Sequence, residues 1–165
     1  MPGFELPDAW LVAGCLFQTA WNLRTGQPAA AQIRDYDLFY FDPSDISEAT
    51  EREVQGRLAA LCADLPVVIE AKNQARVHLW YEDWFGHHYG ALRSSRDGID
   101  RFLVACTCVG LRAPTQGAAP ELYAPHGLAD LQAGLLRPNP KCDHPELFAA
   151  KADSYISRWP WLRVA

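Results

Sequence analysis

Ile33-Arg-Asp-Tyr-Asp-Leu-Phe-Tyr-Phe-Asp42 decides the fold, because this aromatic and aliphatic run, closed by Pro43, predicts a central strand. Side chains alternate along a strand, so Asp35 and Asp37 project to one face, about 6.6 Å apart along the chain, and Tyr36 to the other. Two carboxylates on one face repel each other unless a proton or a cation lies between them. Such hard oxygen ligands favour Mg²⁺ or Mn²⁺. The alternative is a pair of solvated acids that precede a buried strand.

Strands and helices alternate on both sides of this stretch. Trp10 to Ala13 is a short apolar run closed by Gly14, and apolar residues at helical spacing predict a helix over 15–24. After the stretch, an amphipathic helix is predicted with an N-cap at Asp45; its apolar positions are Val54, Leu58, Leu61, Cys62 and Leu65. Pro66 ends that helix, and a third short strand is predicted over 67–69, directly before Glu70.

The second half of the chain is less regular. The pattern predicts helix-compatible residues over 74–82, a loop over 83–94, a helix over 95–105, a strand over 106–112, a short extended piece over 121–124, and small C-terminal helices over 128–136 and 145–159. We therefore expect an α+β fold (α/β two-layer), with a mixed central sheet and flanking helices. We expect one domain over 1–165, with a catalytic core over about 9–112 and a C-terminal extension over about 113–165.

Composition and charge exclude several classes of protein. The chain has 165 residues and a formal charge of −5, with the acidic excess in its first half, so an extended nucleic-acid surface is not expected. The longest apolar run, Phe102 to Leu111, is well short of the about 20 residues that cross a bilayer. No signal peptide is recognisable, and the five cysteines, an odd number, fit reduced thiols and a cytoplasmic location. Nothing in the sequence indicates the oligomeric state.

Further charged residues follow the predicted third strand. Glu70 follows a short apolar run, where it is suited to complete a carboxylate site. If the next residues are helical, Lys72 and Arg76 share a face at i, i+4 and suit triphosphate oxygens. The alternative is a surface ion-pair network. Gly14 lies between a predicted strand and a predicted helix, where backbone N–H groups at the start of the helix can bind a phosphate. The alternative is an ordinary tight turn.

Together these residues resemble a known family. The segments that carry the resemblance are Gly14-Cys-Leu-Phe-Gln-Thr-Ala-Trp21, Asp35-Tyr-Asp-Leu-Phe-Tyr-Phe-Asp42, Glu70-Ala-Lys-Asn-Gln-Ala-Arg-Val-His78, Ala124-Pro-His-Gly-Leu-Ala-Asp130 and Arg137-Pro-Asn-Pro140. They are similar to a bacterial nucleotidyltransferase-like family of the DNA polymerase β-type nucleotidyltransferase superfamily. The resemblance extends from about residue 9 to about residue 162.

The resemblance implies a polymerase β-like fold and metal-dependent transfer of a nucleotidyl group from an NTP to an unidentified hydroxyl acceptor. It implies two Mg²⁺ (or Mn²⁺) ions on three catalytic carboxylates, Asp35, Asp37 and Glu70, and a nucleotide-binding set comprising Gly14, Cys15, Lys72, Asn73 and Arg76. Phe17 and Gln18 stand where the family is expected to have Arg and Asn. The alternative is therefore a catalytically inactive module of the same fold that binds nucleotide or a protein partner.

Two other groups of residues have alternative interpretations. His87-His88, Cys106-x-Cys108 and Cys142-x-His144 suggest zinc, but their spacing departs from that of structural zinc sites, and buried free thiols are favoured. Trp80 and Trp84 recur at helical spacing, which favours a place in the core over a base-stacking surface.

Overall fold

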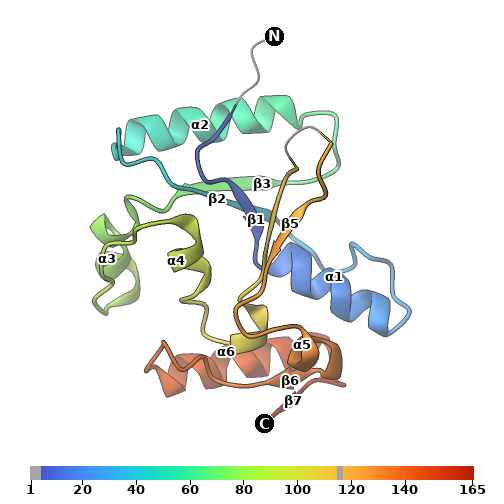
Figure 1. The fold of residues 1–165 in the computed structure, drawn as a ribbon. Helices are drawn as coiled ribbons and strands as arrows, with labels where there is room; N and C mark the ends of the chain where they lie inside the picture. Colours follow the sequence, from blue (N-terminus) through green and yellow to red (C-terminus); the bar gives the residue numbers. More distant parts are fainter. Residues whose placement is uncertain (1–4, 115–116) are drawn as a thin grey trace.

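A mixed five-stranded sheet forms the centre of the computed structural model, which describes residues 5–114 and 117–165 (Figure 1). The strand order is β3-β2-β1-β4-β5; β2 and β3 are parallel and the other neighbouring pairs are antiparallel. The strands are β1 (Trp10–Val12), β2 (Tyr36–Tyr40), β3 (Ile69–Asn73), β4 (Gly110–Arg112) and β5 (Glu121–Tyr123).

Helices surround this sheet. They are α1 (Gly14–Arg24), α2 (Glu48–Leu61), α3 (Tyr81–Phe85), α4 (Ser95–Ile99), α5 (Ala129–Ala133) and α6 (Pro145–Arg158), with 3₁₀ turns at Val77–Leu79 and Ala105–Thr107. A small second sheet pairs β6 (Leu135–Leu136) with β7 (Arg163–Val164). The expected α+β fold with a mixed sheet and flanking helices is confirmed. Among the described helices, none has the length and apolar character needed to span a bilayer.

The two faces of the sheet have different partners. One face packs against α2 through a cluster that includes Tyr40, Leu58 and Ala71. Trp10 and Val12 of β1 point to the opposite face, where they form a second cluster with Ile99 and Cys108. Since Val12 is the register partner of Asp37, the Asp37 side chain also lies on this second face, away from α2.

The largest core cluster joins α1 to the C-terminal part of the chain. The ring of Phe17 lies 5.0 Å from that of Trp21 and 5.4 Å from that of Tyr155. The indole of Trp159 lies 5.4 Å from that of Trp21 and donates a 2.8 Å hydrogen bond to the buried Asn22. Residues 113–165, expected as an extension, thus supply an edge strand of the sheet and a helix packed firmly against α1.

Side chains of α2 cover the outer edge of β3. The amide of Gln55 donates to the carbonyl of Ile69 and accepts from the N–H of Ala71, both at 2.6 Å. One carboxylate oxygen of Glu51 accepts from the N–H of Asn73 at 2.7 Å. These backbone groups alternate with those that pair with β2, so they would otherwise be unpaired at an edge strand.

Several element boundaries differ from the expectation. Glu70 lies within β3 rather than after it, and 72–76 is not a helix, so Lys72 and Arg76 do not share a helical face. The reason is the parallel pairing with β2, which continues to Asn73. The helix expected over 95–105 ends at Ile99, and the strand expected over 106–112 begins only at Gly110, because a 3₁₀ turn intervenes.

Two local predictions are wrong. Ser47, and not Asp45, is the N-cap of α2: its hydroxyl accepts from the N–H of Thr50, while Asp45 accepts from the N–H of Ser47 and the hydroxyl of Thr50. Trp84 is 78% exposed and does not belong to the core, because α3 is a five-residue helix that leaves this ring on the surface.

Candidate functional site

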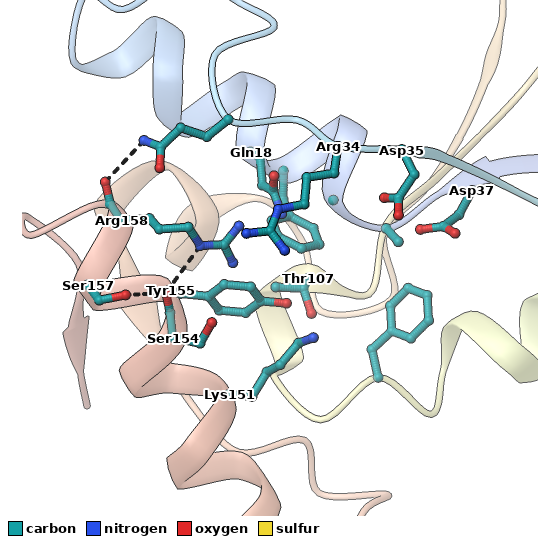
Figure 2. Close-up of a pocket in the computed structure, with 15 residues that line it drawn as sticks. Gln18, Arg34, Asp35, Asp37, Thr107, Lys151, Ser154, Tyr155, Ser157 and Arg158 are labelled. Atoms are coloured by element: carbon teal, nitrogen blue, oxygen red, sulfur yellow. Dashed lines mark hydrogen bonds between the residues drawn. The ribbon is translucent and has the colours of Figure 1, made fainter. Parts of the chain in front are cut away.

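The carboxylate pocket is a cavity of about 670 Å³ between the N-terminus of α1, the residues at the start of β2, and α6 (Figure 2). Its charged lining comes from two distant parts of the sequence. Arg34, Asp35 and Asp37 lie at or before the start of β2, and Lys151 and Arg158 lie on α6. Packing of α1 against α6 brings these parts together.

Asp35 and Asp37 form the negative part of the pocket. Figure 2 shows their carboxylates near each other at the pocket wall, as the alternation along the strand predicts. Burial, and then the charges of Asp35 and Glu70, raise the pKa of Asp37 to about 6. Glu70 is the register partner of Asp37 in β3, so its side chain is on the same face, but it is exposed and does not line this pocket. The structure thus concentrates negative charge at Asp37.

Three cations, Arg34, Lys151 and Arg158, form the positive part of the same pocket. Within the described ranges none of them forms an ion pair with a carboxylate. Burial and the nearby charge of Arg158 lower the pKa of Lys151. Burial also lowers the pKa of Arg158, and the charge of Arg34 lowers it further. Cations that are desolvated and repel one another favour the binding of an anion between them.

The N-terminus of α1 lies at the same pocket. Ala13 has φ 61° and ψ −143°, a backbone conformation that is essentially restricted to glycine, and Gly14 begins the helix. The amide of Gln18 lies over Gly14, where a Cβ would be 2.7 Å from its nitrogen. The thiol of Cys15 points into the core, donates to the carbonyl of Val12 and has its pKa raised to about 12 by burial, so only its backbone faces the helix terminus.

The remaining residues expected to bind nucleotide lie elsewhere. The buried amide of Asn73 donates to the carbonyl of Asp42 and accepts from its N–H, which fixes the end of β3. The guanidinium of Arg76 is also buried and forms a 2.8 Å ion pair with Glu51. Lys72 is exposed and lines neither wall of the carboxylate pocket. Asn73 and Arg76 therefore lie apart from Asp35 and Asp37, whereas Lys72 is on the same face of the sheet as Asp37 and its charge acts to lower the pKa of Asp37.

The sequence reasoning missed the cations of the pocket. Within the helix expected over 145–159, Lys151, Tyr155 and Arg158 recur at i, i+4 and i+7, which places them on one face. That spacing is the pattern that would have identified them. Phe17 lines the pocket but is buried, because its ring packs on those of Trp21 and Tyr155; a guanidinium at this position would be buried between these rings.

The donor set fits a divalent cation that is completed by a substrate. In the part of the chain that the structure describes, no three His, Cys, Asp or Glu side chains are close enough together to hold a metal ion by themselves, which leaves the zinc alternative without support. Mg²⁺, however, is ordinarily held by one or two carboxylates together with substrate phosphates and water. Asp35 and Asp37, with the burial and then the neighbouring negative charges that raise the pKa of Asp37, meet that requirement.

Known proteins show the same combination of fold and sequence. A family model described as "Nucleotidyltransferase" matches residues 1–164. A solution NMR structure described as revealing a CCA-adding enzyme head domain is 29% identical and superimposes with a TM-score of 0.76; the match covers 98% of this chain and 83% of that chain. No curated protein matches.

Proposed function

Since the chain belongs to the nucleotidyltransferase family and has the fold of that family, as the resemblance predicted, we propose that it transfers a nucleotidyl group from an NTP to a hydroxyl acceptor. Membership supports an NTP as one substrate. The acceptor, the metal dependence and the residues that act are our proposal.

The observation that carries the proposal is the division of charge in the carboxylate pocket. Two carboxylates lie at the β2 wall, and three cations without carboxylate partners among the described residues line the same cavity. A metal–triphosphate complex has the complementary arrangement, because its cation suits the carboxylates and its phosphate oxygens suit arginine and lysine. The alternatives for the separate motifs are an ordinary tight turn at Gly14 and solvated acids at Asp35 and Asp37. Neither alternative accounts for three cations in the same pocket.

Asp35 and Asp37 would hold the metal. Glu70, expected from the resemblance as the third carboxylate, shares their face of the sheet but does not line the pocket, so the described geometry gives it no place beside a metal that Asp35 and Asp37 hold. Two Mg²⁺ or Mn²⁺ ions supply activation of the acceptor hydroxyl and neutralisation of the triphosphate. Lys151 and Arg158 bind the β- and γ-phosphates, and the N-terminus of α1 at Gly14 offers backbone N–H groups to an oxygen of the phosphate chain.

In the proposed reaction the acceptor oxygen forms a bond to the α-phosphorus while the bond from that phosphorus to the bridging oxygen of the β-phosphate breaks. Pyrophosphate leaves, and its charge is matched by Lys151, Arg158 and Arg34. The acceptor proton passes to Glu70, which is exposed beside Asp37, or to water.

Two labelled forms of each NTP test this function. The protein is incubated with Mn²⁺ and small-molecule, protein or RNA fractions of a cell extract, with ³²P in either the α or the γ position. We expect α label in one fraction and γ label in pyrophosphate. Transfer of γ label to an acceptor would instead show phosphoryl transfer and refute the proposal. Asp37→Asn is expected to abolish transfer, whereas Asp64→Asn, in the exposed turn after α2, serves as the matched control.

The alternative, an inactive module, rests on Phe17 and Gln18 standing where the resemblance leads us to expect arginine and asparagine. The structure offers a physical substitute, because Arg34, Lys151 and Arg158 bring positive charge to the same pocket from other elements. Metal-dependent NTP binding that is lost in Lys151→Gln, without transfer of either label to any fraction, would favour the inactive module over the enzyme.

A further inference from the structure

A second pocket, which we call the ring pocket, lies between α3, the loop over 86–94, α4 and the N-terminus of α6. Its volume is about 480 Å³, within the range of small-molecule sites. Its lining shares no residue with the carboxylate pocket. The turn over 100–103 separates the two, since Arg101 and Leu103 line the ring pocket whereas Phe102 lines the carboxylate pocket.

Aromatic rings make up one wall of the ring pocket. Tyr81 and Tyr89 are stacked with ring centroids 4.2 Å apart. His87 lies 5.2 Å from Tyr81 and 4.2 Å from His144, which directly precedes α6. Because Tyr81 and Tyr89 cover each other and the Arg101 guanidinium lies over Tyr89, the wall offers ring edges together with imidazole and phenol groups, a combination suited to edge contacts with a planar ring that carries polar substituents.

The charges of the ring pocket leave one guanidinium available. The carboxylate of Asp97 accepts from Arg93 at 3.1 Å, and that of Asp100 accepts from the Tyr123 hydroxyl at 2.7 Å and pairs with Lys141. These two carboxylates are therefore engaged by partners inside the protein, whereas Asp143, the third carboxylate of the lining, is exposed and forms no ion pair among the described residues.

Arg101 differs from the other cations of the ring pocket. Its guanidinium lies over the ring of Tyr89 at 4.7 Å and donates only a long 3.4 Å hydrogen bond to the carbonyl of Gly90. No carboxylate among the described residues is within ion-pair distance of it. A half-buried guanidinium held by stacking keeps N–H groups free to donate to two oxygens of an oxyanion such as phosphate.

We infer that the ring pocket binds a phosphate-bearing ring compound of the nucleoside monophosphate class. The phosphate lies against Arg101 and the imidazoles of His87 and His144, and the base lies along the tyrosine wall. This inference concerns binding alone and does not rest on the proposed transfer reaction, because neither Asp35 nor Asp37 lines this pocket.

NMR titration of the ¹⁵N-labelled full chain in EDTA tests the inference. The probes are AMP, GMP, CMP and UMP, each with its nucleoside, and inorganic phosphate. We expect at least one monophosphate to shift the signals of Tyr89, Arg101 and His144, with an affinity at least about fivefold above that of its nucleoside and of phosphate. Equal affinity for phosphate, shifts confined to the carboxylate pocket, or no shifts at all would overturn the inference.

Substitutions locate the same site independently. Arg101→Gln is expected to weaken binding at least about fivefold. Because Arg101 also packs on Tyr89, His144→Ala provides a second variant outside that packing, with the same direction of effect expected. Arg163→Gln, on exposed β7 and outside both pockets, is the matched control and is expected to leave the affinity unchanged, whereas weakened binding in Lys151→Gln would place the ligand in the carboxylate pocket. The opposite ranking of these variants would refute the assignment to the ring pocket, whatever the outcome of the transfer assay.

Discussion

Asp37→Asn is expected to stabilise the metal-free protein at neutral pH. Asp37 has its pKa raised from 3.8 to about 6, so the folded state holds its proton more tightly than the unfolded state does. The stability that this proton contributes is present below pH 3.8 and is lost as pH rises through about 6. At about 1.4 kcal/mol per pH unit the difference corresponds to about 3 kcal/mol, and solvent screening in an open pocket reduces this to about 1.5 kcal/mol.

Urea denaturation in EDTA measures this effect. At pH 7.5 the free energy of unfolding of Asp37→Asn is expected to exceed that of the unsubstituted protein by about 1.5 kcal/mol. The excess should shrink toward zero as pH falls from 6 to 4, because the native carboxylate then becomes neutral like the amide. Asp64→Asn should show no such dependence. An Asp37→Asn protein that is less stable at pH 7.5, or an excess that does not change with pH, would refute the reasoning about charge crowding.

Three further substitutions test the description of the fold, each by urea denaturation. Ala13→Gly removes backbone strain and is expected to stabilise by about 1–2 kcal/mol; a loss of stability would mean that the strain is absent. Arg76→Met leaves Glu51 as an unpaired buried charge and is expected to cost about 3–5 kcal/mol, whereas a cost below about 1 kcal/mol would contradict the buried pair. Gly134→Ala is expected to cost at least about 2 kcal/mol, because Gly134 has φ +67° and a Cβ there would lie 2.3 Å from the ring of Trp161; near-neutral behaviour would contradict that contact.

The sequence predicted the central sheet and its carboxylates because those features are local. The alternation around Asp35 and Asp37 and the glycine that begins α1 depend on neighbouring residues alone. The path of 72–76 depends instead on pairing with β2, which the local pattern does not contain, so that pattern leaves open a helix from Lys72 where the strand in fact continues to Asn73. The local pattern does not reveal the cations of the pocket for the same reason. Lys151 and Asp37 line one pocket because α6 packs against α1, and that packing joins distant parts of the chain.

The hydrogen bonds from side chains of α2 to the outer edge of β3 have a consequence for folding. Gln55 presents a donor and an acceptor to Ile69 and Ala71 as a neighbouring strand would, so the edge of β3 is closed to other chains only once α2 has docked. A folding intermediate without α2 would expose that edge and associate with its own copies. The helix and the strand should therefore form and open as one cooperative unit, in which the amides of Ala71 and Asn73 exchange with solvent at the same rate. Gln55 and Glu51 thus link the protection of this edge from other chains to the docking of one helix.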